Sequence, residues 1–157
     1  MTDAVPREVA EAFYDAFASR DPARIAAFIG DDVDWLIVGP VDLLPFCGQR
    51  RGKRAAMEVF ERLVPEVLHI KAVSREALLI DGDQASALSK LSAIHRTSGR
   101  QISYRIAQFM QFRDNKIAVY RTVIDSFNAA EQMLGHPIDL DQDRLRAPAG
   151  FGDLVAV

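Results

Sequence analysis

The sequence has little that would place the protein outside the reducing interior of a cell. It contains one cysteine, Cys47, so no disulfide can form within the chain. No stretch approaches the roughly 20 apolar residues of a membrane-spanning helix. The N-terminal segment MTDAVPREVAEAF has no apolar run of the kind found in signal peptides. We therefore expect a soluble, cytoplasmic protein.

The sequence also lacks the charge and the ligand spacing of two common classes of binding protein. A formal net charge of -3 gives no positive field for nucleic acid or anionic lipid. The three histidines, His69, His95 and His136, show no metal-ligand spacing. We expect no nucleic acid or membrane partner, no metal and no cofactor.

What remains is the composition of one folded domain. The chain has 157 residues, of which 49% are hydrophobic and 26% charged, enough to bury a core. We predict one domain over residues 1–135, followed by a C-terminal tail over residues 136–157 that carries prolines and charges.

Helical periodicity is confined to the first part of the chain. Apolar residues recur at helical spacing over residues 5–19 and again over 53–64, where Pro65 marks the end of the helix within a turn. Between them, Asp21 followed by Pro22 indicates the start of a short helix that ends at Gly30. These patterns predict three N-terminal helices.

The remaining segments read as strands. Residues 34–39 predict a strand that is followed by a proline-containing loop through Phe46 and Gly48. Alternating residues over 69–125, divided by turn signals at Asp81-Gly82, Ser98-Gly99 and Asp114-Asn115, predict a four-strand antiparallel meander. A last short helix is expected over 126–134. The predicted fold is α+β, with a curved antiparallel sheet packed against the three helices and enclosing one pocket.

Turn geometry predicts which side chains share the inner face of this sheet. A two-residue loop at Asp114-Asn115 fixes the register, and side chains alternate between faces. The same treatment of Ser98-Gly99 adds residues from the preceding strand. The predicted inner face therefore carries apolar residues with a polar cluster at one end: Ser89, His95, Tyr104, Ile106, Gln108, Met110, Phe112, Ile117, Val119, Arg121, Val123 and Asp125.

Three residues of this cluster are predicted to be catalytic. Asp125, a carboxylate at the end of an apolar face, is a candidate general base or acid, with an N-cap role as the alternative. His95 is the candidate proton shuttle, although a half-exposed histidine at a hairpin end is the plainer interpretation. Tyr104 is the candidate donor to an oxyanion, or a space-filling residue with a satisfied hydroxyl.

Six further residues are predicted to bind the ligand. Arg121 and Gln108 would hold a carboxylate, enolate or carbonyl oxygen, with a structural Arg121–Asp125 pair as the alternative. Trp35, Phe46 and Tyr14 would line the mouth, with core packing as the alternative, and Met110 would belong to the wall. The basic residues Arg50, Arg51, Lys53 and Arg54 attract an anionic ligand or form a solvated charge run.

In order and spacing, these features resemble the nuclear transport factor 2-like superfamily, in particular SnoaL-like and ketosteroid-isomerase-like proteins. The carriers are AFYDAFASRDPARIAAFIGDDVDW, G-QRRGKRAAMEVFERL and FMQFRDNKIAVYRTVID, within residues 6–128. The resemblance implies a sheet shaped as a cone-like half-barrel around a cavity, and a homodimer formed through the outer face of the sheet. It also implies isomerase, cyclase, dehydratase or epoxide-opening chemistry, or binding alone.

The steroid isomerase pattern itself is not matched. Gly39 stands where that enzyme has its aspartate base, Phe13 where it has a tyrosine and Gln108 where it has a protonated aspartate. Steroid isomerisation by that mechanism is therefore not expected. The leading hypothesis is a cofactor-independent acid–base enzyme acting on a hydrophobic small molecule. The alternative is a non-catalytic ligand-binding or dimeric interaction module.

Overall fold

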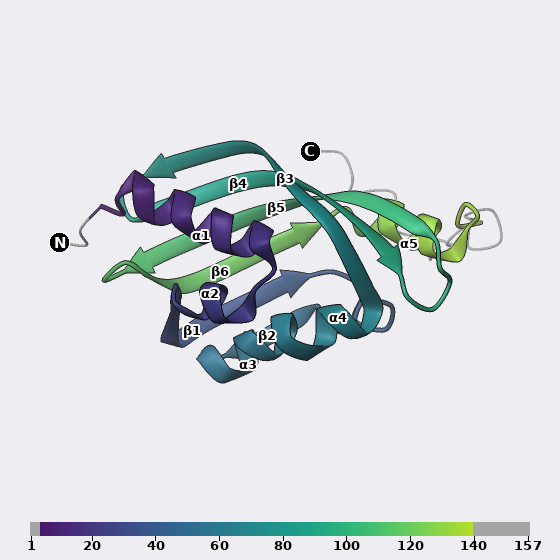
Figure 1. Cartoon of the computed structure of the whole chain (residues 1–157), viewed down its shortest axis with the longest axis horizontal. Helices are drawn as coiled ribbons and strands as arrows, with labels where there is room; N and C mark the ends of the chain where they lie inside the picture. The colour runs from purple at the N-terminus through teal and green to yellow at the C-terminus, as the bar shows by residue number, and fades with distance from the viewer. Residues whose placement is uncertain (1–3, 140–157) are drawn as a thin grey trace, which may run out of the picture.

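The computed structural model describes residues 4–139 and forms a curved six-stranded sheet with helices on its concave side (Figure 1). The order along the chain is helices, short strands, helices, then a long meander and a final helix. The elements are α1 Arg7–Ser19, α2 Pro22–Ala26, β1 Ile29–Val38, β2 Gly48–Arg51, α3 Lys53–Glu58, the π-helix η1 Val59–Leu63, α4 Val64–Val67, β3 Leu68–Asp81, β4 Gln84–His95, β5 Gln101–Arg113, β6 Lys116–Ile124 and α5 Ser126–Leu134.

The predicted α+β class, the helices and the four-strand meander are confirmed. Asp21 begins α2 as expected, because its side chain accepts a hydrogen bond from the Ala23 N–H at 2.9 Å. The third helix ends at Val67, within a turn of Pro65 as expected, and Pro65 lies in α4, which follows directly on the π-helix η1. Other boundaries differ. The second helix ends at Ala26 rather than at Gly30, which lies in β1, and β1 covers Ile29–Val38 rather than 34–39. Residues 48–51, for which no strand was predicted, form β2.

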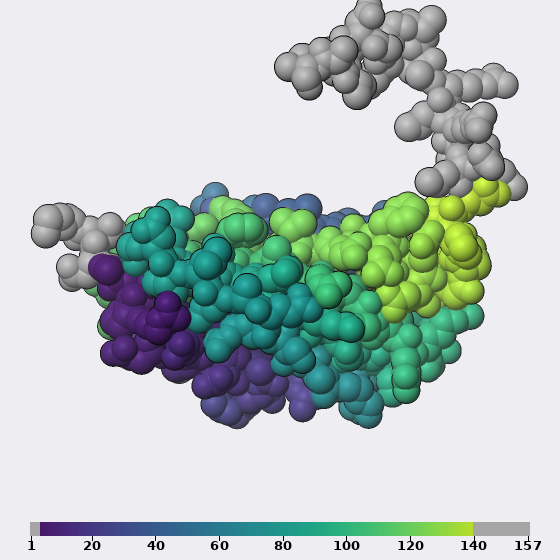
Figure 2. Space-filling view, turned by 90° about the horizontal axis from the view of Figure 1, so that it is seen from above, coloured from purple at the N-terminus to yellow at the C-terminus, as the bar shows by residue number. Residues whose placement is uncertain are grey.

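The sheet has the order β2-β1-β6-β5-β4-β3, and only β1 and β6 are parallel among the described strands. β3 leaves α4 and bends across the molecule to the edge nearest α1 (Figure 1). The space-filling view shows α1 and α5 at opposite ends of an elongated body (Figure 2). The predicted tail lies mostly outside the described residues, which end at 139.

The core lies between the helices and the inner face of the sheet. Along β5 every second residue is buried, from Ile102 through Tyr104 and Gln108 to Phe112. From the helices, Phe13 on α1 packs edge-on against the Tyr120 ring of β6, with 6.5 Å between the ring centres. This packing fixes the helices over the sheet and leaves a cavity toward the α4 end.

Candidate functional site

A cavity of about 380 Å³ lies between the helices and the inner face of the sheet. Its size falls in the range of small-molecule sites, roughly 300–1,000 Å³. All of the layers contribute to its wall, which is largely aliphatic and aromatic. The apolar lining residues are Phe17, Ile25, Ile37, Phe46, Val59, Phe60, Val64, Pro65, Leu68, Ile70, Val73, Leu91, Ile106 and Ile124.

Tyr104 supplies a polar group to this wall that has no hydrogen-bond partner in the described part of the chain. It extends from β5, is only 3% exposed, and lines the cavity. Within residues 4–139 its hydroxyl makes no hydrogen bond. Burial raises the pKa of this phenol well above its ordinary value of 10. The hydroxyl therefore stays protonated at neutral pH and is available as a donor to a bound molecule.

A second polar group, the Tyr120 hydroxyl on β6, lies in the cavity wall beside Trp35 of β1, with Gln108 of β5 behind it. The Trp35 and Tyr120 rings stack with 3.6 Å between their centres and an angle of 7°. The Gln108 amide donates to the Tyr120 hydroxyl at 2.6 Å. Burial raises the pKa of Tyr120 to about 12, so this phenol is also neutral. Trp35 and Tyr120 both line the cavity. They thus present an aromatic surface to it, with the buried Gln108–Tyr120 hydrogen bond behind that surface.

A β-bulge decides which residues of β6 face the cavity. The predicted turn is correct, since Asp114 and Asn115 form a two-residue loop with Arg113 opposite Lys116. Phe112 pairs with Ile117, but Gln111 pairs with Val119, which leaves Ala118 as one extra residue on β6. Beyond it the alternation is reversed. The inner side chains are therefore Tyr120, Thr122 and Ile124, and the predicted inner positions of Val119, Arg121 and Val123 are wrong.

Arg121 accordingly lies on the outer face. Its guanidinium donates to the Asp34 carboxylate at 2.6 Å and to the Asp34 carbonyl at 2.8 Å. The hydrogen bond from Arg121 is the largest cause that lowers the pKa of the Asp34 carboxyl below its ordinary value of 3.8. The predicted position of Arg121 beside a ligand is thus corrected, and the predicted pair with Asp125 is replaced by a pair with Asp34.

The two other residues of the predicted catalytic group do not line the cavity. Asp125 is exposed at the start of α5, where its carboxylate accepts a 3.3 Å hydrogen bond from the Asn128 amide. The predicted two-residue loop at Ser98-Gly99 is longer, because the Gly99 N–H binds the His95 carbonyl and Ala93 pairs with Ile102. His95 therefore ends its strand, and its ring binds the Ser98 hydroxyl at 2.8 Å.

The remaining predicted residues lie on the inner side. Trp35 and Phe46 line the cavity as expected, together with Tyr104. Gln108 and Met110 are buried on the inner face but behind the lining, Gln108 against Tyr120 and Met110 with its sulfur 4.0 Å from the Tyr14 hydroxyl. Tyr14 is buried in the core rather than at a mouth. Whether any of these residues acts on a ligand stays a prediction.

Sequence reasoning missed Tyr120, Thr122 and the residues at the mouth. One signal could have found the first two. The segment KIAVYRTVI alternates acceptably in either phase, but only the phase with Tyr120 and Thr122 inside keeps the charge of Arg121 out of an apolar face. The mouth residues, Arg20, His69 and Arg96, come from three separate elements and carried no such signal.

The structure also accounts for glycine at position 39. A Cβ added to Gly39 would lie 2.6 Å from the Cys47 sulfur, so the buried Cys47 side chain occupies the space that a side chain at position 39 would need. Cys47 is buried, and burial raises the pKa of its thiol to about 11. The position that holds a catalytic aspartate in steroid isomerases is therefore filled by packing, and the thiol beside it is protonated.

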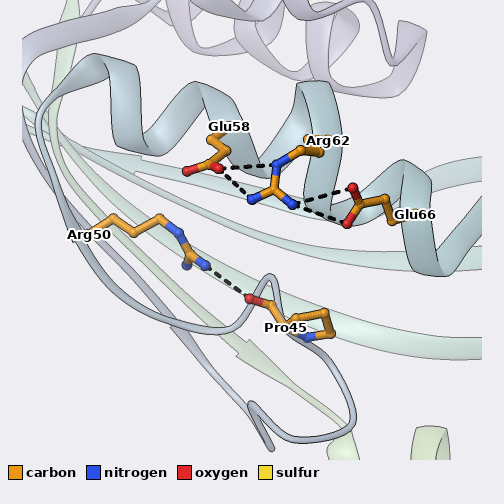
Figure 3. A network of polar contacts seen from close by, with 5 residues as sticks. All are labelled: Pro45, Arg50, Glu58, Arg62 and Glu66. Atoms are coloured by element: carbon orange, nitrogen blue, oxygen red, sulfur yellow. Dashed lines mark hydrogen bonds and ion pairs between the residues drawn. The ribbon is translucent and has the colours of Figure 1, made fainter.

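Arg50 holds the loop that carries Phe46. Its guanidinium donates to the carbonyls of Pro45, Phe46 and Cys47 at 2.9 to 3.1 Å. The bond to Pro45 is shown in Figure 3. Above it, on the helix from α3 to α4, Arg62 lies between the carboxylates of Glu58 and Glu66, four residues away on either side (Figure 3). Arg50 therefore has a structural role in this loop, while attraction of a ligand by the basic cluster stays a prediction.

Two other kinds of site find no support in the part of the chain that the structure describes. No three His, Cys, Asp or Glu side chains come together there as a metal ion requires. Among residues 4–139, no helix has the length and apolar character needed to cross a membrane.

Comparison with known proteins places the fold. The SnoaL-like domain profile matches residues 10–120. A Rhodopseudomonas palustris protein named "Putative Isomerase" is 34% identical, with a TM-score of 0.71 over 87% of this chain and 100% of that one. An LEH-like epoxide hydrolase from M. tuberculosis is 19% identical, with a TM-score of 0.64 over 82% and 88%. TerC, crystallised with polyporic acid, is 20% identical, with a TM-score of 0.70 over 81% and 96%. No curated protein matches the chain significantly.

Proposed function

The chain belongs to the SnoaL-like domain family, with the NTF2-like fold, and from its cavity we propose that it binds a hydrophobic small molecule bearing an oxygen that accepts a hydrogen bond. The observation that carries the proposal is Tyr104. A phenol at 3% exposure with no partner among the described residues is an unmet donor in a largely apolar interior. A carbonyl or hydroxyl oxygen of a ligand would satisfy it.

The shape and the lining of the cavity support the same proposal. Small-molecule sites are concave and mostly apolar, with a few polar groups that orient the ligand. Here Tyr104 and Tyr120 line the wall, with Gln108 hydrogen-bonded to Tyr120 from behind, and these groups are polar but uncharged. A neutral donor suits a neutral oxygen, because neither partner needs to bury a charge. TerC, of the same fold, was crystallised with polyporic acid, so the fold accommodates such molecules.

A cavity-blocking substitution tests this proposal. We expect Leu91→Trp to fill the cavity from β4 and to abolish saturable binding of the neutral fluorescent probe N-phenyl-1-naphthylamine. Leu134→Trp, at a position on α5 that is 45% exposed, is the matched control and should bind the probe as the wild type does. Equal binding by wild type and Leu91→Trp would show that the probe binds elsewhere and would refute the proposal.

An acid–base enzyme, of isomerase, cyclase, dehydratase or hydrolase type, is the second candidate. It is favoured by the 34% identical relative named as an isomerase. Against it, no carboxylate is found among the described residues that line the cavity, and the predicted base Asp125 is exposed. His69 at the mouth is the remaining basic group of the lining suited to proton transfer.

Ligand recovery separates the two candidates. A binding protein returns a bound molecule chemically unchanged, whereas an enzyme converts it. Mass spectrometry of the molecules that copurify with wild type and with His69→Ala distinguishes these outcomes. A product found only with the wild type favours the enzyme. Substituting the predicted pair, as Asp125→Asn and His95→Ala, tests the earlier catalytic hypothesis in the same assay.

We also propose that the chain forms a homodimer through the outer face of the sheet. An apolar row crosses four strands there, because Leu88 pairs with Ala107, Ala107 with Val123, and Val123 with Val38. Leu88, Val123 and Val38 are 37 to 48% exposed, and Phe109 beside them is 51% exposed. Exposed apolar groups that adjoin in this way are typical of interfaces.

Solution mass tests the dimer. We expect the wild type to have twice the mass of the chain by light scattering, and Val123→Lys to be monomeric, since a charge would be buried between two apolar surfaces. Val41→Lys, at an exposed loop position, should remain dimeric. A monomeric wild type at micromolar concentration would refute this arrangement. A cytoplasmic location is likewise our proposal, consistent with the single cysteine.

A further inference from the structure

The mouth of the cavity differs in character from its interior. Four lining residues are exposed to solvent: Arg20, Pro65, His69 and Arg96. Two of them are permanently positive. None of the described lining residues is acidic. The cavity therefore has a cationic rim around an uncharged, largely apolar interior.

Both arginines are held in place by backbone carbonyls on either side of the start of β3. Arg20 ends α1 and donates through Nη1 to the carbonyls of Ile70 and Lys71. Arg96 follows β4 and donates through Nε to the carbonyl of Pro65. Each bond uses only part of a guanidinium, which has five N–H donors. The other donors of both side chains make no ion pair within residues 4–139.

The nearest acidic neighbours in sequence are engaged elsewhere. Asp21, next to Arg20, uses its carboxylate to cap α2 at the Ala23 N–H. Glu66, next to Pro65, pairs with Arg62 at 3.2 Å, on the side of the helix shown in Figure 3. The positive charge at the mouth is therefore not cancelled by these two groups.

From this arrangement we propose that the ligand is an amphipathic anion, with an apolar body inside the cavity and a carboxylate-type head group between Arg20 and Arg96. This inference rests on the binding function proposed above and specifies its ligand class. A guanidinium is the side chain best suited to a carboxylate, because its donors match the two oxygens. A head group at the rim stays partly hydrated while the body leaves water, so no charge is buried without a partner. Tyr104 is left to bind an oxygen deeper in the cavity.

Three probes with one tail and different heads test the proposal. Decanoate, decan-1-ol and decyltrimethylammonium carry the same chain length with negative, neutral and positive heads. Each is titrated against the protein saturated with N-phenyl-1-naphthylamine, and its affinity is obtained from displacement of that neutral probe. We expect decanoate to bind about fivefold to tenfold more tightly than decan-1-ol at low ionic strength, and the cation to bind weakest.

Variants test whether the preference for decanoate over decan-1-ol comes from the arginines at the mouth. Arg96→Gln and Arg20→Gln should each reduce the decanoate-to-decanol ratio toward one, with little effect on decan-1-ol. Arg113→Gln, an equal change of charge at an exposed position on the distant β5–β6 hairpin, is the control and should keep the wild-type ratio. Thermal unfolding of each variant checks that it is folded. For the wild type, raising NaCl from 20 to 300 mM should weaken the binding of decanoate but not the binding of decan-1-ol.

The outcomes separate this inference from the function on which it rests. If the neutral probe fails to bind, or binds equally to Leu91→Trp, the binding function and the ligand class both fail. If the neutral probe and decan-1-ol bind but decanoate has no advantage, the ligand class alone is refuted. If Arg113→Gln reduced the preference for decanoate over decan-1-ol as much as Arg96→Gln does, the preference would come from the net charge of the protein. That result would also overturn the proposal.

Discussion

The two faces of the sheet are built from the same strands but handle polar groups in opposite ways. On the inner face the polar side chains are neutral and buried, as with Gln108 donating to the Tyr120 hydroxyl. On the outer face they are charged, paired and partly exposed, as with Arg121 and Asp34. A buried ion costs far more than a buried hydrogen-bonded amide or phenol. The cavity can therefore be polar without being charged, and its charges are confined to the mouth.

The largest expected difference between the faces is in side-chain burial. Trp35 is fully buried and stacked on Tyr120, so Trp35→Ala should lower the free energy of unfolding by about 3–5 kcal/mol. Leu79, on the outer face, is 71% exposed, and Leu79→Ala should change it by less than about 0.5 kcal/mol. Urea unfolding measures both. Similar losses for the two variants would contradict the burial difference.

A smaller effect should separate the hydrogen bonds of the two faces. Tyr120→Phe removes the partner of the Gln108 Nε2, whose neighbouring Oε1 already has none in the described residues. We expect a loss of about 1–3 kcal/mol, because a buried amide is then left unsatisfied.

Adding Gln108→Leu to that variant should recover part of the loss, since no buried amide remains, and the double-mutant cycle measures the coupling. On the outer face, Arg105→Gln breaks the exposed pair with Glu76 and should have less effect than Tyr120→Phe. Simple additivity of Tyr120→Phe and Gln108→Leu would exclude the inner hydrogen bond as a source of stability.

The smallest effect is a dependence on pH that belongs to the outer face. The pKa of Asp34 is lowered chiefly by the hydrogen bond from Arg121. A carboxyl whose pKa is lower in the folded state adds stability above its unfolded pKa, and this is lost as the pH falls through the folded value. The wild type should therefore be more stable to unfolding than Arg121→Gln at neutral pH. This difference in stability should be lost as the pH falls below the ordinary carboxyl pKa of about 3.8. Urea midpoints at pH 7 and pH 3 measure this, and an advantage that grows on acidification would contradict it.

The elements were predictable because each depends on local signals. Apolar residues at helical spacing before residue 64 and at alternating positions after 68 indicated which side of each element is buried. Asp114-Asn115 predicted a hairpin turn that the structure contains. For β5 this was enough, because Tyr104, Gln108 and Met110 all face inward as predicted.

The candidate site was less predictable because it depends on irregularities. No residue type marks Ala118 as the extra residue, and only the charge of Arg121 favours the outward phase that the bulge produces. The longer turn after His95 left its ring on Ser98 rather than over the sheet. Arg20 and Arg96 meet at the mouth through tertiary packing, which periodicity does not report.

The bulge at Ala118 divides β6 into two parts whose side chains alternate in opposite phase. Before the bulge, the hairpin register decides which side chains are buried. After it, Tyr120, Thr122 and Ile124 face inward instead of Val119, Arg121 and Val123. Regular pairing through Ala118 at the same chain length would place Val119, Arg121 and Val123 inside in place of Tyr120, Thr122 and Ile124, without changing any side chain. Deletion of Ala118 itself would remove the bulge and leave Tyr120, Thr122 and Ile124 on the cavity wall. Among chains of this fold, a strand one residue shorter at this point can therefore build the same wall, and an alignment compares inner residues with inner ones only if it places the extra residue at the bulge.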